Sequence, residues 1–325
     1  MNTPPELDPE TLQEVLRRGW GFAARSLEYA PLGFGSHHWI AAGPGGERRF
    51  VTVDDLSMKR GPQDRDAAFA ALDRAFRSAL VLAEGGLDFV VAPVPDEKGA
   101  VLQRLDERFS VAVFPFLEGR VGLDGEFASD AERRLVTDRV RELHRATGVV
   151  QGVAGCEDFA LPWRSSLEES LRRIGEPWTG GPYGEPARRL LQDRAGDVRE
   201  GLAAYDHLVR EVRSDGSPFV ITHGEPHGSN VMWIDGRPHL IDWDSALLGP
   251  PARDLWMLTP YRPGEDGGLT LYRLWWELAE IGGYLGIFRG SHAANEDTAE
   301  AWQNLQEFAG LQTLQAIRAR RPNGG

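Results

Sequence analysis

Residues 221–244 read ITHGEPHGSNVMWIDGRPHLIDWD, and they are the most informative part of the chain. A polar loop, residues 223–230, follows the apolar run 219–221. The second half predicts a β-hairpin, because Asp235-Gly236 between apolar runs is typical of a tight two-residue turn. A tight turn brings the two ends of its hairpin together. We therefore expect polar residues of the loop to meet the acidic end of the hairpin.

The side chains that should meet there are mainly oxygen donors. The loop supplies a carboxylate and an amide, and the end of the hairpin supplies two further carboxylates. Such a hard, oxygen-rich set suits Mg²⁺ and bound phosphates rather than zinc. The set consists of Glu225, His227, Asn230, Asp242 and Asp244.

The composition is that of an ordinary globular protein. Of the 325 residues, 41% are apolar, so a core of usual size can form. The single cysteine excludes an intrachain disulfide, and no apolar leader or membrane-length segment is visible, so we expect a cytoplasmic protein without a membrane partner. The net charge of −13 argues against a nucleic-acid partner. It is compatible with a cationic small molecule, although acidity can serve solubility alone.

The first ~115 residues predict a sheet of about five strands crossed by one long helix. A short helix over 8–19 comes first, with Asp8 as its cap. The long helix spans 64–84, where apolar residues recur at helical spacing before two glycines. Strands are expected at 25–30, 38–42, 49–53, 90–92, 101–104 and 111–117.

After Gly119 the pattern becomes helical. Residues 115–120 contain proline and glycine and are the expected boundary between the two regions. Helices are predicted over 129–147, 164–174, 185–213, 268–287 and 294–320.

The informative stretch resembles the signature of the aminoglycoside phosphotransferases and related small-molecule kinases, especially the spectinomycin and aminoglycoside branch. That signature looks like His-Gly-Asp-x-His-x-x-Asn and then Ile-Asp-[Trp/Phe]-[Asp/Glu]; here HGEPHGSN occupies 223–230 and IDWD occupies 241–244. A later Arg-Asp-Leu element of the family matches 253–255. The resemblance implies an α+β, protein-kinase-like two-lobed fold. Residues 1–116 would form a small antiparallel-sheet N-lobe that binds nucleotide. Residues 117–325 would form a larger, mainly helical C-lobe with the catalytic loop, metal site and acceptor pocket.

The resemblance also assigns roles within the C-lobe. Asp242 and Asn230 would hold Mg²⁺, and Asp244 would support the metal or a nearby loop. Glu225 takes the position of the catalytic base, where the family usually has aspartate. His223 is a second candidate catalytic residue, although a buried histidine that holds the loop is the commoner case. Arg253-Asp254 is interpreted as a pair that braces the lobe.

In the N-lobe, nucleotide binding is assigned to a turn, a strand and a hinge. The turn before the second strand can lay backbone N–H groups on a phosphate. The third strand carries threonine at the position of the family's lysine, and residues 113–117 look like the hinge that meets the adenine. The candidate residues are Gly33, Gly35, Ser36, Thr52, Phe114 and Phe116.

The missing lysine is the main departure from the family. Only two lysines occur in the chain, Lys59 and Lys98, and Lys59 lies seven positions after Thr52. Either Lys59 or an arginine curls in, or nucleotide binding is weaker, or metal and backbone hold the phosphates. Asp66 and Asp73 are candidates for the helix carboxylate that would pair with a lysine.

These features predict an enzyme that moves the γ-phosphoryl group of ATP or GTP to a hydroxyl of a small molecule. An aminoglycoside-like or aminocyclitol antibiotic is the expected acceptor, and acidic residues such as Glu168 and Glu265 could meet its ammonium groups. The alternative is a pseudokinase-like protein that binds nucleotide or another ligand with little turnover. A metal-dependent phosphate hydrolase is a third, weaker alternative. The acceptor's identity and the oligomeric state stay open.

Overall fold

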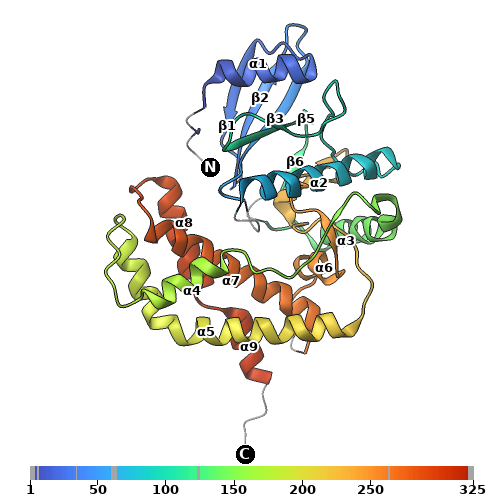
Figure 1. Ribbon diagram of the computed structural model, residues 1–325. Helices are drawn as coiled ribbons and strands as arrows, with labels where there is room; N and C mark the ends of the chain where they lie inside the picture. Colours follow the sequence, from blue (N-terminus) through green and yellow to red (C-terminus); the bar gives the residue numbers. More distant parts are fainter. Residues whose placement is uncertain are drawn as a thin grey trace, which may run out of the picture. The chain divides into compact units, whose positions relative to one another are not determined.

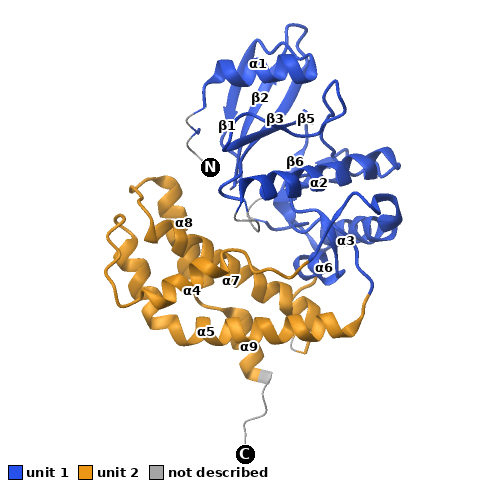
Figure 2. Ribbon diagram, in the orientation of Figure 1, with its two compact units in different colours: residues 1–157, 218–258 blue, residues 158–217, 259–325 orange. Residues whose placement is uncertain are grey.

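The computed structural model describes residues 4–5, 7–33, 35–59, 64–122, 125–262 and 264–320. The chain forms two compact units, and each is described by itself (Figure 1, Figure 2). The first unit joins residues 1–157 to 218–258, so it contains both the N-terminal sheet and the informative stretch. The second unit consists of residues 158–217 and 259–325. The lobe boundary at residue 116 remains a prediction.

A five-stranded antiparallel sheet, in the order β1-β2-β3-β5-β4, begins the first unit. Its side chains alternate between two hydrophobic clusters, as the period of a strand requires. Val51 and Val111 pack with the leucines of α1, whereas Ala112 and Phe114 pack with residues of α2. The elements are α1 (Pro9–Trp20), β1 (Ser26–Ala30), β2 (Ser36–Ala42), β3 (Arg48–Asp55), α2 (Arg65–Glu84), β4 (Gln103–Arg104) and β5 (Phe109–Pro115).

Two of the predicted elements differ in this region. The strand expected at 90–92 is reduced to a single bridge between Val90 and Leu240. The stop of the first helix is Gly21, with φ 61°, rather than Gly19. Asp8 caps that helix as predicted, accepting a hydrogen bond from the Glu10 N–H.

The informative stretch forms the predicted hairpin. Strands β9 and β10 pair antiparallel, and Asp235 and Gly236 both have positive φ, 48° and 73°, as a type I′ turn requires. Leu240 and Trp243 belong to the same hydrophobic cluster as residues of α2 and α3. This shared core packs residues 240–243 against α2 and α3. The elements are β6 (Arg120–Val121), α3 (Asp130–Arg145), β7 (Gly155–Cys156), β8 (Val220–Thr222), β9 (Val231–Ile234), β10 (Arg237–Leu240), β11 (Leu247–Gly249) and α6 (Ala252–Leu258); the 3₁₀ turns η1 and η2 span Ala146–Val150 and Gly228–Asn230.

The second unit is helical, and α5 packs along α7. The single helix expected over 294–320 is instead two helices, because the chain turns through Gly310 and Leu311, which has φ 45°. The carboxylate of Glu277 accepts hydrogen bonds from the N–H and hydroxyl of Thr313 and so caps the second of them. Its helices are α4 (Arg164–Arg172), α5 (Gly184–Asp215), α7 (Gly267–Arg289), α8 (Glu296–Phe308) and α9 (Gln312–Arg320). None of the helices in the described ranges is long and apolar enough to cross a membrane.

Candidate active site

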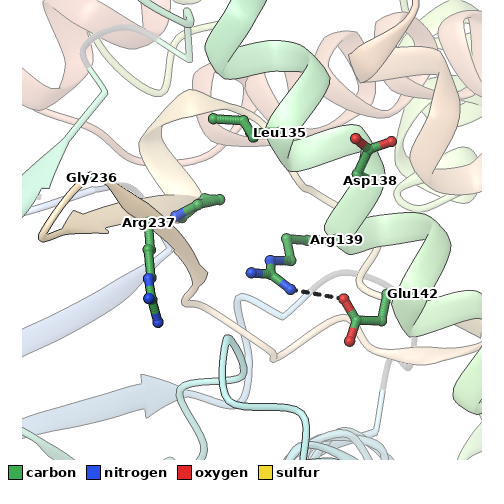
Figure 3. A pocket seen from close by; sticks show the side chains of 7 residues that line it. Leu135, Asp138, Arg139, Glu142, Gly236 and Arg237 are labelled. Carbon is green, nitrogen blue, oxygen red and sulfur yellow. Dashed lines mark hydrogen bonds and ion pairs between the residues drawn. The ribbon is translucent and has the colours of Figure 1, made fainter.

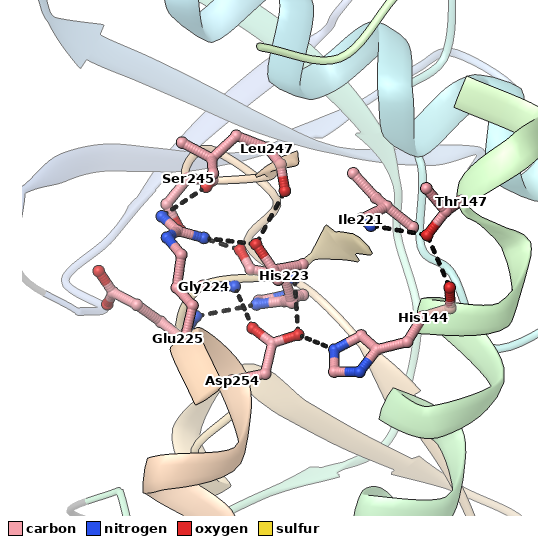
Figure 4. A network of polar contacts seen from close by, with 11 residues as sticks. His144, Thr147, Ile221, His223, Gly224, Glu225, Ser245, Leu247 and Asp254 are labelled. Carbon is pink, nitrogen blue, oxygen red and sulfur yellow. Dashed lines mark hydrogen bonds and ion pairs between the residues drawn. The ribbon is translucent and has the colours of Figure 1, made fainter. Parts of the chain in front are cut away.

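A buried carboxylate holds the start of the polar loop (Figure 4). Asp254, from α6, is 0% exposed, and its two oxygens accept hydrogen bonds from the backbone N–H groups of His223 and Gly224, at 3.1 and 2.7 Å. The Nε2 atom of His144, on α3, lies 2.8 Å from the same carboxylate. Burial alone would raise the pKa of Asp254, but the hydrogen bonds and charge of His144 and the backbone N–H groups outweigh it and lower that pKa. Asp254 is thus an ionised clamp on the loop.

The imidazole of His223 is also committed to holding the loop. Its Nε2 donates to the carbonyl of Ile241 at 2.9 Å, and its Nδ1 accepts from the Glu225 N–H at 3.3 Å. The ring packs edge-on against Trp243, with centroids 4.7 Å apart. Burial lowers the pKa of His223, which keeps the ring neutral and fits one donor and one acceptor nitrogen. His223 therefore ties the loop to the hairpin end.

Arg253 braces the same loop from the other side, as the sequence indicated. Its guanidinium donates to the Thr222 hydroxyl and to the carbonyl of Ser245, each at 2.9 Å, and forms an ion pair with Glu157. Gly224 fits between these groups, because a Cβ there would lie 2.5 Å from the Ser245 Oγ and 2.6 Å from Nη1 of Arg253.

Replacing Gly224 by alanine should therefore destabilise the first unit more than its backbone conformation alone would. Gly224 has φ 101° and a crowded neighbourhood, whereas Gly236 has φ 73° and open space around it. Gly236→Ala should cost about 1 kcal/mol of unfolding free energy from φ alone, and Gly224→Ala a further 1–3 kcal/mol or so from overpacking. Urea unfolding of both variants measures the difference. Equal losses would contradict the crowding described here.

Glu225, His227 and Asn230 come together within the loop. The Asn230 side chain donates through Nδ2 to the Glu225 carbonyl at 3.0 Å, and the same nitrogen lies 3.4 Å from His227 Nε2. Both contacts use the nitrogen end, so the amide oxygen can still bind a cation. The carboxylate of Glu225 lies 3.9 Å from His227 Nε2 and is partly open to solvent.

The two aspartates at the hairpin end differ in their surroundings. Asp242 has φ 64°, a left-handed conformation that aspartate tolerates better than most residues. Desolvation, and after it the negative charge of Asp244, raises the pKa of Asp242 well above its ordinary range, although the residue as a whole is exposed. Asp244 has an ion partner instead: its Oδ2 lies 2.9 Å from Nζ of Lys59.

Lys59 places an ammonium group beside the end of β3. Its Nζ lies 2.6 Å from Oδ1 of Asp54 and donates to the Ser36 hydroxyl at 3.0 Å. Thr52, where the family's lysine was expected, points its hydroxyl at Nδ1 of His38, 3.2 Å away on the neighbouring strand. Burial, and next the charge of Lys59, lowers the pKa of His38 to about 4. Of the alternatives raised by the sequence, these contacts favour a Lys59 that curls in toward the hairpin end.

The helix carboxylates proposed as partners of a lysine are engaged elsewhere. Asp66 pairs with Arg104 across from β4, and Asp73 pairs with Arg77 one turn along α2. The carboxylate that pairs with Lys59 instead comes from Asp54, at the end of β3. No sequence signal of the family pointed to Asp54.

The remaining nucleotide candidates lie around the same sheet. Gly33 and Gly35 have positive φ, 63° and 105°, so the turn before β2 requires glycine. Ser36 follows it directly and donates to Asp54 at 2.7 Å. Phe114 is buried against Phe76 of α2, with centroids 5.5 Å apart, so at this residue only the backbone is suited to meet a base. Phe116 lies beneath the guanidinium of Arg48, 3.9 Å from the ring centroid.

A surface depression of about 290 Å³ lies apart from these residues, between α3 and the turn of the β9–β10 hairpin (Figure 3). Arg139 and Glu142 form an ion pair at its edge, 2.9 Å apart. None of the candidate catalytic, nucleotide or metal residues lines it. The candidate active site therefore lies apart from this depression.

Comparison with known sequences agrees with the geometry. A model of the phosphotransferase enzyme family matches residues 40–284. Protein StrN of Streptomyces griseus is 29% identical over 286 residues, which cover 82% of this chain and 86% of StrN. Stress response kinase A of Escherichia coli is 35% identical over 78 residues, 22% of this chain and 24% of that kinase.

Solved structures show the same fold. A spectinomycin phosphotransferase, solved with ADP and spectinomycin, has a TM-score of 0.73 at 16% identity and covers 97% of this chain and 99% of its own. Amicoumacin kinase, solved with AMP-PNP and Ca²⁺, has a TM-score of 0.58 at 12% identity, with 95% of both chains covered. The predicted α+β, protein-kinase-like fold is confirmed. The chain therefore belongs to the phosphotransferase enzyme family, and it is an ATP-dependent small-molecule kinase of the aminoglycoside phosphotransferase type.

Proposed function

We propose that this enzyme transfers the γ-phosphoryl group of ATP or GTP to a hydroxyl of a small antibiotic-like molecule. One observation supports this most strongly. Lys59 joins Ser36, beside the glycine turn, to Asp244, two residues after Asp242. The candidate phosphate-binding turn and the candidate metal site thus meet at one ammonium group. Phosphoryl transfer needs positive groups beside the phosphates to neutralise their charge.

Mg²⁺ fits the residues at the hairpin end. Asn230, Asp242 and Asp244 offer hard oxygen donors. Desolvation first, and next the negative charge of Asp244, raises the pKa of Asp242, and a bound cation would oppose both effects. Within the described ranges, no cluster of three or more His, Cys, Asp or Glu side chains is arranged to hold a metal alone. Magnesium in kinases needs few protein ligands, because phosphates and water complete its shell. When bound, it would neutralise charge on the β- and γ-phosphates.

Glu225 is proposed to orient the acceptor. Its backbone is fixed from two sides, by His223 through the N–H and by Asn230 through the carbonyl. The carboxylate stays partly exposed, so an acceptor hydroxyl can reach it. In a loose transition state such a group mainly positions the hydroxyl and accepts its proton late. The longer side chain of glutamate, compared with aspartate, would place that hydroxyl slightly farther from the loop.

The acceptor class is proposed from the similarity to solved structures and not from the acidic residues of the second unit. The acidic candidates of the second unit already carry arginine partners: Glu168 pairs with Arg164, and Glu265 with Arg273. The structural relatives include proteins crystallised with spectinomycin and with hygromycin B. We therefore place hydroxylated aminocyclitol and aminoglycoside antibiotics first among the acceptors to be tried.

A turnover assay tests the proposal. The protein is incubated with Mg²⁺ and ATP or GTP against a panel of hydroxylated antibiotics, sugars and amino alcohols, and nucleoside diphosphate release is measured. Glu225→Gln should lower kcat about 10²-fold or more with little change in nucleotide KM, because it removes the proton acceptor but keeps the side-chain size. Glu84→Gln, a matched change at an exposed position at the end of α2 in the same unit, should leave turnover unchanged. Acceptor-independent release that survives Glu225→Gln would sink the proposal and favour a hydrolase.

A further inference from the structure

Three groups from separate parts of the chain surround the ammonium of Lys59. Ser36 follows the glycine turn, Asp54 lies on β3, and Asp244 lies at the end of the hairpin. Ser36 also donates to the same Asp54 oxygen that pairs with Lys59. This cluster connects the sheet to the candidate metal site through a single side chain.

The chain is built to return Lys59 to the strand that it has just left. The carboxylate of Asp55 accepts a hydrogen bond from the Ser57 N–H at 2.9 Å, and the Met58 N–H donates to the Asp55 carbonyl at 3.0 Å. This aspartate turn reverses the direction of the chain. Arg108 fixes Asp55 in turn, through an ion pair of 2.6 Å. Lys59 follows this turn, and its ammonium group returns to Asp54 of β3.

Asp54 depends on Lys59 for its compensation. It is 0% exposed, and its Oδ2 has no hydrogen-bond partner among the described residues. A buried carboxylate without a cation is costly, so the pair has to form when the protein folds. Burial opposes the charge of Lys59 too, but the carboxylates of Asp244 and Asp54 prevail and raise the pKa of Lys59 above its ordinary value.

We propose that Lys59 is the nucleotide-phosphate-binding lysine of this enzyme, and that Asp54 of β3 is the carboxylate that anchors it. In the family pattern the third strand carries the lysine. In this chain the strand carries the acid, and the turn that follows it carries the lysine. Asp54 holds one side of the ammonium, and the other side, now shared between Ser36 and Asp244, binds phosphate oxygens. This inference rests on the proposed function, because it assumes that a nucleoside triphosphate is the phosphoryl donor.

Equilibrium binding tests it with two ligands that differ only in their phosphates. Mg·AMP-PNP and adenosine are titrated by calorimetry into the wild type and into Lys59→Met. A lost charge-assisted contact should weaken AMP-PNP about 10- to 100-fold, whereas adenosine should bind within about twofold of the wild type. Lys98→Met is the matched control, since Lys98 is the only other lysine and lies exposed in a turn. It should leave both affinities unchanged.

A second variant separates binding from folding. Lys59→Met leaves the buried charge of Asp54 uncompensated, so the double variant Asp54→Asn, Lys59→Met removes both charges together. It should melt closer to the wild type than the single variant and still show the phosphate-specific loss. Lys59→Arg should keep part of the AMP-PNP affinity, because it keeps the charge on a differently shaped group.

The outcomes distinguish the two levels of the proposal. If the double variant binds AMP-PNP as tightly as the wild type, or loses adenosine equally, Lys59 is a structural bridge and the assignment fails while the kinase proposal stands. If the wild type itself binds no nucleotide and transfers no phosphate, the proposed function fails first.

Discussion

Replacing Asp242 by asparagine is expected to lower kcat about a thousandfold or more, while the nucleotide-free protein becomes more stable. Charge that is aimed at the transferring phosphate carries most of the catalysis in this reaction, and the loss of one such group costs about 10²–10³-fold or more. The pKa of Asp242 is raised in the fold, so its ionised form disfavours folding at neutral pH. Asparagine removes that charge. Residues that serve activity often lower the stability of the folded protein.

The measurement pairs steady-state kinetics with thermal unfolding in EDTA. Melting of Asp242→Asn should occur at a higher temperature than that of the wild type near pH 7. The gap should close as the pH falls through the raised pKa, because the wild-type carboxyl is then neutral as well. Asp138→Asn is the control, since Asp138 is exposed on α3 beside Arg141 and should change neither quantity. A variant with full activity would remove Asp242 from the site.

The hairpin and the loop could be predicted because their signals are local. A type I′ turn needs two residues that accept positive φ, and the pair Asp235-Gly236 is typical of such a turn. Once the turn is fixed, the register of β9 and β10 follows, and with it the approach of Asp242 to the loop. The long helix α2 was equally predictable from its spacing and from Asp64, which caps it.

Lys59 could not be placed in the same way. Strand periodicity tells which face a residue takes, but it ends with the strand at Asp55. Where the next four residues go depends on the Asp55 turn and on Arg108, which reaches Asp55 from the neighbouring strand end. Asp66 and Asp73, the helix carboxylates suggested by the family pattern, were wrong partners, because ion pairs between distant elements also cannot be read from spacing. Their arginines come from tertiary neighbours, as with Arg104, or from the helix itself.

The buried clamp on the loop was visible in the sequence only as a bracing pair. Its partners lie on three elements: His144 on α3, Asp254 on α6 and the loop itself. Their meeting depends on how α3 and α6 pack, which no motif spacing specifies. We therefore expect the segment after the hairpin to affect turnover only through the position of the loop.

Asp254→Asn should accordingly cost both stability and activity. Its carboxylate satisfies two buried backbone N–H groups and His144, and an amide nitrogen in its place adds a donor where acceptors are needed. We expect a loss of about 3 kcal/mol or more in the free energy of unfolding and about a hundredfold loss in kcat, because the loop that carries Glu225 moves. Urea unfolding and turnover measure the two effects. Asp66→Asn, at an exposed ion pair, should change the free energy of unfolding by less than about 0.5 kcal/mol.

The pH dependence identifies the charge as the cause. The pKa of Asp254 is lowered in the fold, so its stabilisation is fully present above the unfolded value of about 4. It is lost as the pH falls through the lower, folded value. The stability difference between wild type and Asp254→Asn should thus stay constant from pH 7 to about 5 and then narrow in more acidic solution. A difference that is independent of pH throughout would mean that shape, and not the ionised carboxylate, holds the catalytic loop.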